Sequence, residues 1–150
     1  MKVNKIVLPN SVMLGEVKSL IAEGRDVIIP TKGNSMLPFI RGERDSVNLR
    51  KLQDISVGDI VLAEIREGCY VLHRVFELDG DRVTLMGDGN LRGVERCTRA
   101  QIAGTAIEIL RNGEKTVDCR SPKAVRQARV WRRLMPFRRI ILGFYRRLFL

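Results

Sequence analysis

The stretch 60–86, IVLAEIREGCYVLHRVFELDGDRVTLM, decides the fold class of this 150-residue chain. It contains three apolar runs, which are separated by the turn-forming pairs Glu67-Gly68 and Asp79-Gly80. Short runs that are rich in Val, Ile, Leu and Tyr and bounded by Gly and Asp are typical of β-strands joined by tight turns. We therefore predict three consecutive strands over 60–65, 69–76 and 82–86.

The same pattern continues on both sides of this stretch. Turn signals separate further strand-like runs, which lie at 26–31, 46–49, 101–110 and 115–119. Strands at a spacing of about 8–12 residues, joined by Gly and Asp turns, favour antiparallel pairing. The sequence therefore predicts a mainly β body.

Helical spacing occurs near both ends of the chain. Asn10 or Ser11 can cap a helix that continues to about Glu23 and ends at Gly24. From Pro122 onward, apolar residues recur at helical spacing on two faces: Val125, Ala128, Trp131 and Met135, and then Phe137, Ile141, Phe144 and Leu148. Pro136 lies between the two sets, so we expect a short N-terminal helix and a helical C-terminal segment with a break or kink.

Charge divides the chain into a body, residues 1–119, and a tail, residues 120–150. The tail contains ten of the 27 Lys and Arg and none of the 17 Asp and Glu, so 17 basic residues balance 17 acidic ones in the body. The net charge of +10 therefore belongs to the tail alone. A neutral body without a base-reading motif argues against a nucleic-acid partner.

Two interpretations of the basic tail remain open. Its helices could pack on the β body with their arginines in solvent. Residues 124–150 could instead lie on an anionic membrane surface, because arginines surround an apolar Trp/Phe/Ile/Leu face and each gains about 1 kcal/mol near anionic lipid.

Neither a metal nor a cofactor is expected. The three cysteines, Cys69, Cys97 and Cys119, lack metal-binding spacing, and the chain has one histidine. We expect reduced thiols, with a disulfide between two of them as the alternative. The N-terminus lacks a secretory pattern, and no window offers the ~20 apolar residues of a spanning helix. We therefore expect a cytoplasmic protein, peripheral on the inner face of the membrane if the tail binds lipid.

Residues 31–40, TKGNSMLPFI, place a serine in a glycine-rich turn after a strand-like run. Gly33 and Asn34 allow a sharp turn, so the backbone amides of Asn34 and Ser35 could face a developing oxyanion. A serine hydroxyl needs a base that takes its proton, and histidine suits that task near neutral pH. His73, the only histidine, and Asp88, in a Gly-Asp-Gly-Asn turn, offer a base and a carboxylate to orient it.

Each of these residues taken alone has a simpler structural explanation, as a turn serine, a core histidine and a turn aspartate. Taken together they occur in five ordered blocks: GNSMLPFI (33–40), RDSV (44–47), VGDIVLAEI (57–65), VLHRV (71–75) and MGDGN (86–90). The blocks resemble the type I signal peptidase family, and most of all its Ser-His branch, over about residues 27–110. The resemblance implies coiled antiparallel sheets with a small barrel-like portion.

The resemblance also implies a cofactor-free serine endopeptidase that cleaves a peptide or precursor protein after small residues. Carried over block by block, Ser35 is the nucleophile, His73 the general base and Asp88 the acidic or structural partner. Asp45 is interpreted as a structural turn residue. Of the apolar run Met36, Leu37 and Pro38, we expect part to line a substrate groove and part to pack in the core.

Three features depart from the family pattern. Members usually begin with a membrane-spanning helix, which this sequence lacks. The Ser-His branch has further aspartates after the Gly-Asp-x-Asn block, whereas here Glu95 is the only nearby acid, so the third role could belong to Asp88, to Glu95 or to neither. Gly33 stands where some members have a hydroxyl, so an oxyanion hole would be made by backbone. The alternative function is a catalytically inactive peptide-binding or membrane-associated adaptor on the same fold.

Overall fold

The computed structural model describes residues 3–5, 11–112 and 114–150. Its strands are β1 Val3–Lys5, β2 Asp26–Pro30, β3 Ser46–Arg50, β4 Ile60–Arg66, β5 Cys69–Asp79, β6 Arg82–Met86, β7 Glu95–Thr98, β8 Ile102–Arg111 and β9 Lys115–Asp118. Its α-helices are α1 Ser11–Ala22, α2 Pro122–Arg133 and α3 Arg138–Phe149, and its short 3-10 helices are η1 Arg99–Gln101 and η2 Met135–Phe137.

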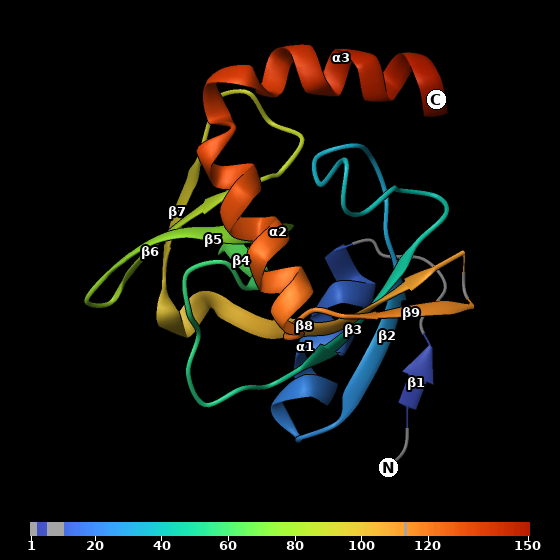
Figure 1. Cartoon of the computed structure of the whole chain (residues 1–150). Coiled ribbons are helices and arrows are strands. Elements are labelled where there is room, and N and C mark those ends of the chain that lie inside the picture. The colour runs from blue at the N-terminus through green and yellow to red at the C-terminus, as the bar shows by residue number, and fades with distance from the viewer. Residues whose placement is uncertain (1–2, 6–10, 113) are drawn as a thin grey trace.

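The strands form one sheet in the order β1-β2-β3-β8-β4-β5-β6-β7, and β9 also pairs with β8 (Figure 1). Every pairing is antiparallel except that of β1 with β2. The prediction of a mainly β body with short helices is confirmed.

The meander β4-β5-β6 contains the three strands predicted over 60–86. The turns between them place Gly68 at φ 74° and Gly80 at φ 58°, in the left-handed region that glycine adopts without strain. β5 extends to Asp79, beyond the predicted end at 76, because Asp79 pairs with Arg82 across a two-residue turn.

Strand β8 joins two parts of the sheet. Its first half pairs with β4 and its second half with β9, while β3 pairs along the other edge. One core cluster lies under α1, where Val17 and Ile21 pack against β2, β3, β4 and β8. A second lies among β4, β5, β6, β7 and β8 and includes Val75 and Leu85. The described sheet is not closed, because β1 and β7, the strands at its two ends, do not pair with each other, so the barrel-like portion that the resemblance implies stays a prediction.

Helix α1 extends from Ser11 to Ala22 and ends before Gly24, close to the predicted bounds, and Asn10, one of its two predicted caps, lies outside the described residues. In the tail, the Ser121 side chain caps α2 by accepting a hydrogen bond from the Ala124 amide at 3.2 Å. The break at Pro136 is confirmed, because η2 separates α2 from α3. Of the helices that the structure describes, none is both long enough and apolar enough to span a membrane.

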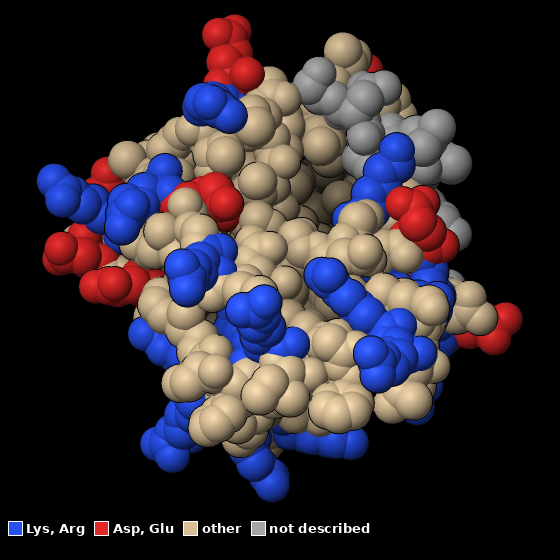
Figure 2. Space-filling view, turned by 90° about the horizontal axis from the view of Figure 1, so that it is seen from above, with Lys and Arg blue, Asp and Glu red and all other residues tan. Residues whose placement is uncertain are grey.

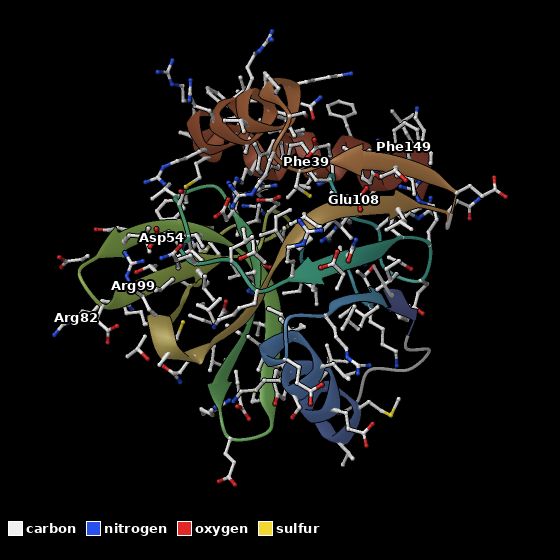
Figure 3. The ribbon with its side chains drawn as sticks, turned by 90° about the horizontal axis from the view of Figure 1, so that it is seen from below. Phe39, Asp54, Arg82, Arg99, Glu108 and Phe149 are labelled. Atoms are coloured by element: carbon white, nitrogen blue, oxygen red, sulfur yellow. The ribbon has the colours of Figure 1, made fainter. Side chains whose placement is uncertain are left out.

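The tail packs on the body with one side. Trp131 of α2 and Leu142 of α3 are buried together with Leu37, which belongs to the loop between β2 and β3. Phe39 of the same loop lies between the tail and the sheet (Figure 3), edge-on to Trp131 with ring centroids 5.9 Å apart. The packing interpretation of the tail therefore holds for this inner face.

Candidate active site

Ser35 and His73 line one cleft, whose volume is about 270 Å³. Ser35 belongs to the loop between β2 and β3, and His73 lies in the middle of β5, where it is 6% exposed. The remaining wall is largely apolar and includes Leu14, Ile29, Met36, Ile40, Leu62 and Leu72. Two residues that are 38 positions apart in the sequence thus reach the same cleft, as the catalytic hypothesis requires.

The turn that carries Ser35 is fixed by close backbone contact with the 87–90 turn. The Gly89 amide donates a hydrogen bond to the Ser35 carbonyl oxygen at 2.8 Å. A Cβ atom at Gly87 would lie 2.3 Å from that same oxygen, and one at Gly89 would lie 2.3 Å from the Asn34 carbonyl oxygen. These glycines are therefore required because no side chain fits between the two turns.

The base of the Ser35 loop is closed by Asp45, whose side chain is fully buried. Its carboxylate accepts hydrogen bonds from the Arg41 amide at 2.9 Å and from Arg44 Nε at 2.7 Å. Burial by itself would raise the pKa of Asp45, but the hydrogen bonds from Arg44 and Arg41 outweigh it, so the pKa lies below its ordinary value. The interpretation of Asp45 as a structural turn residue is confirmed.

Glu95 is the acid that contacts the imidazole. Its Oε1 lies 2.5 Å from His73 Nδ1, and it reaches the ring from β7, two strands away across the β5-β6-β7 meander. An ionised carboxylate can only accept hydrogen bonds, so this contact places the ring proton on Nδ1. The other ring nitrogen, Nε2, is then the one with a lone pair for a proton from a hydroxyl.

Asp88 does not fill this position, and the expectation that it is the acidic partner of His73 is wrong. Its carboxylate binds Arg74, with Nε to Oδ1 at 2.8 Å and Nη2 to Oδ2 at 2.6 Å. Consecutive residues of a strand point to opposite faces, so Arg74 turns away from the face that His73 shares with the cleft, and Asp88 follows Arg74. The structural alternative for Asp88 is the one the geometry supports.

The Arg74–Asp88 ion pair is almost fully enclosed, with exposed side-chain fractions of 16% and 2%. Burial alone would lower the pKa of Arg74, but the charge of Asp88 and its hydrogen bonds outweigh that effect, so the pKa lies above its ordinary value. The Asp88 carbonyl oxygen also accepts a hydrogen bond from Trp131 Nε1 at 2.9 Å. Asp88 therefore joins β5, the 87–90 turn and the tail.

Only one of the three residues expected to line a substrate groove reaches the cleft. Met36 lines the cleft, but Leu37 does not, because it is fully buried against Trp131 and Leu142. Pro38, which follows a cis peptide bond, is half-buried and does not line the cleft either. The groove assignment is thus supported for Met36 and wrong for Leu37 and Pro38, because the tail covers the surface on which Leu37 packs.

The Ser35 hydroxyl and the predicted oxyanion donors are not occupied by other hydrogen bonds in the part of the chain that the structure describes. Among the described residues, the Ser35 and His73 side chains do not hydrogen-bond to each other, a looseness common in sites without substrate. The amides of Asn34 and Ser35 likewise have no hydrogen-bond partner in the part of the chain that the structure describes. Both predicted oxyanion donors are therefore available.

Sequence reasoning missed three contributors to this region. Lys32 and Tyr70 line the cleft, and Arg74 holds Asp88. Strand alternation beside His73 could have identified Arg74, whereas the pattern around Tyr70 gives no such signal. Burial and the neighbouring Glu64 raise the pKa of Tyr70, so its hydroxyl stays protonated near neutral pH.

Replacing Gly89 with Ala should displace the Ser35 turn. The new Cβ would meet a backbone oxygen, which cannot rotate away, so we expect the free energy of unfolding to fall by about 1–3 kcal/mol in urea denaturation. The matched control is Gly143→Ala in α3, where nothing lies within 4 Å of the new Cβ; it should be neutral or stabilise by up to about 1 kcal/mol. Equal effects of both substitutions would contradict the close contact.

The arrangement provides a hydroxyl and a ring nitrogen bound by a carboxylate at one cleft, with the amides of Asn34 and Ser35 in the turn that carries the hydroxyl. Within the described ranges, no cluster of three or more His, Cys, Asp or Glu has the geometry of a metal site. A scan against protein-family models and a search of curated proteins both give no match for this chain.

Proposed function

We propose that the protein is a serine endopeptidase of the signal-peptidase type, which cleaves a peptide or the leader segment of a precursor protein. One observation carries the proposal: Ser35 and His73 line the same cleft while Glu95 occupies the Nδ1 side of the imidazole. This leaves Nε2 as the basic nitrogen, and it is the arrangement that activates a serine hydroxyl.

In the proposed mechanism, His73 Nε2 takes the proton of Ser35 Oγ as the oxygen attacks the scissile carbonyl carbon. The amides of Asn34 and Ser35 donate hydrogen bonds to the resulting oxyanion. Glu95 stabilises the imidazolium, which then gives its proton to the leaving amine and releases the C-terminal product. Water, deprotonated by the same nitrogen, hydrolyses the acyl ester and restores the serine.

The shape of the cleft suits a short, apolar segment of an extended peptide. Its volume of about 270 Å³ lies just below the range of about 300–1,000 Å³ that is usual for small-molecule sites. The aliphatic wall offers few polar groups for an ordered ligand apart from Lys32, Thr31 and Tyr70. Such a cleft accommodates one or two small apolar side chains next to the scissile bond.

Covalent labelling tests the proposal without knowledge of the natural substrate. A fluorophosphonate forms a P–O bond to an activated serine Oγ and releases fluoride, so intact-mass spectrometry counts the labels. We expect one label on Ser35 in the wild type, none in Ser35→Ala, and labelling about 10²–10⁴-fold slower in His73→Ala, which lacks the base. Ser19→Ala, which removes an exposed hydroxyl in α1, should label like the wild type. The proposal fails if Ser35 in the wild type stays unlabelled.

The second candidate is a non-catalytic module that binds peptides in the same cleft. The absence of a Ser35–His73 hydrogen bond among the described residues favours it. The two candidates differ in the fate of a mixed peptide library, because the enzyme releases new termini whereas the module retains intact peptides. Mass spectrometry of the library after incubation with the full chain separates these outcomes.

A further inference from the structure

Helix α3 has an inner face that docks on the protein and an outer face that is largely exposed. Leu142 is 3% exposed and packs with Trp131 and Leu37, while Ile141 and Tyr145 border the same cluster. This docking fixes the rotation of α3 about its axis, so the residues of its outer face are defined.

The outer face of α3 is apolar. Ile140, Phe144 and Leu148 recur every fourth residue and are 61%, 62% and 72% exposed. Residues four apart lie above one another on a helix, so these side chains form one stripe. Three further apolar side chains that are more than half exposed lie at the two ends of the helix, and they are Phe137, Phe149 and Leu150. A stripe of large exposed apolar side chains such as Ile140, Phe144 and Leu148 marks a binding surface rather than ordinary scattered exposure.

Basic side chains flank this stripe. Arg139, Arg146 and Arg147 are exposed on α3, and residues 120–150 contain no Asp or Glu. Figure 2, seen from the side of α3, shows basic side chains spread over an otherwise uncharged surface in its lower half, where no acidic side chains gather. The partner must therefore present negative charge at its surface and apolar volume directly beneath.

A bilayer that contains anionic lipid offers this combination to a helix lying in its plane. Nucleic acid offers the charge without the apolar volume. We propose that α3 binds an anionic membrane interface, with Ile140, Phe144 and Leu148 entering the acyl boundary and the arginines contacting headgroup phosphates. No residue of α3 lines the Ser35–His73 cleft, so this surface is independent of the proposed peptidase activity.

Vesicle flotation of the full chain tests the proposal. Wild-type protein should float with vesicles of equimolar phosphatidylglycerol and phosphatidylcholine and much less with pure phosphatidylcholine. The variant I140S/F144S/L148S should bind the anionic vesicles at least about 100-fold more weakly, and R139Q/R146Q/R147Q about 100-fold more weakly. Point substitutions are preferable to deletion of the tail, because deletion would also uncover Leu37.

Matched variants control for the number of residues changed. V12S/V57S/L91S removes three exposed apolar side chains outside the tail sequence, and K51Q/R82Q/R96Q removes three exposed cations. Arg82 lies on the side of the molecule away from the tail helices (Figure 3). Both controls should bind anionic vesicles like the wild type.

A fluorescence experiment distinguishes insertion from surface adsorption. In Phe144→Trp, the new indole should be quenched by lipids with brominated acyl chains when vesicles bind. The native Trp131, on the inner side of α2, is 4% exposed, so the wild type should show little quenching and serves as the baseline. Quenching of Phe144→Trp alone places the outer face in the acyl boundary.

Several outcomes would overturn the proposal. They are absence of wild-type binding to anionic vesicles, unchanged binding of I140S/F144S/L148S, and unquenched Phe144→Trp in bound protein. A dimer in analytical ultracentrifugation that this apolar variant abolishes, without any vesicle binding, would assign the face to a second copy instead. Ser35→Ala should bind vesicles normally, so failure of the peptidase proposal leaves this result unaffected.

Discussion

Ser35→Ala and His73→Ala should each lower kcat/KM for peptide hydrolysis by at least about 10⁴-fold while the fold stays intact. The Ser35 side chain makes no hydrogen bond within the described residues, and the turn is held through its backbone oxygen. Its removal should therefore leave the free energy of unfolding almost unchanged. His73→Ala removes the only imidazole of the chain and with it the proposed base.

The measurement uses a peptide selected from the library that the wild type cleaves, with circular dichroism and thermal unfolding as checks on folding. The double variant Ser35→Ala/His73→Ala provides a sharper test, because a nucleophile and its base act as a unit. We expect it to be no slower than either single variant. If the rate loss of the double variant were the product of the two single losses, the two side chains would act independently, which would contradict the mechanism.

Asp88→Asn and Glu95→Gln should have opposite consequences, although both change a carboxylate to an amide. Asp88→Asn leaves the guanidinium of Arg74 enclosed without its counter-charge, so we expect a loss of about 3–5 kcal/mol in the free energy of unfolding. Glu95 is 24% exposed and binds a ring nitrogen, so Glu95→Gln should cost less than about 1 kcal/mol.

The loss of activity should follow the reverse order, larger for Glu95→Gln than for Asp88→Asn. Glu95→Gln can present an NH₂ group to Nδ1 and shift the ring proton to Nε2, which removes the base, so kcat should fall on the order of 10²–10⁴-fold. Asp88→Asn, assayed at a temperature where it is folded, should retain most of its kcat. A stable Asp88→Asn protein that is inactive would restore Asp88 to the catalytic role.

A double-mutant cycle separates the Arg74–Asp88 interaction from side effects of each substitution. Arg74→Ala should destabilise the wild type strongly but cost much less in an Asp88→Ala background, because the charge it would leave behind is already absent. Chemical denaturation of the four proteins gives the coupling free energy. A coupling near zero would mean that the ion pair seen between β5 and the 87–90 turn does not stabilise the fold.

Several features of the fold follow from local sequence pattern. The period-two runs and the glycine turns at 68 and 80 specify the β4-β5-β6 meander, and helical spacing with Pro136 specifies the two-part tail. These signals are readable because backbone sterics and side-chain periodicity act over a few neighbouring residues. The same local signals placed Ser35 in a turn and His73 in a strand.

Local sequence pattern did not predict which residue pairs with each buried charged side chain. Asp88 is 15 positions from His73 and Glu95 is 22, yet Glu95 meets the imidazole because the register of β5, β6 and β7 carries it there. Asp88 instead forms an ion pair with Arg74, whose side chain faces the other side of β5. Such choices depend on strand register and sheet curvature, which the packing of distant segments sets.

By itself, the sequence determined most of the strands, the turns and the basic tail, since these follow from local backbone and periodicity rules, whereas Ser35 and His73 were proposed for catalysis from the resemblance that five sequence blocks carry. Only the tertiary structure decided that Glu95 orients His73, that Gly87 and Gly89 hold the Ser35 turn, and that Leu37 lies beneath the tail. It also decided which face of α3 remains exposed. These outcomes require contacts between segments far apart in the chain, and close packing of those segments leaves room for only one arrangement.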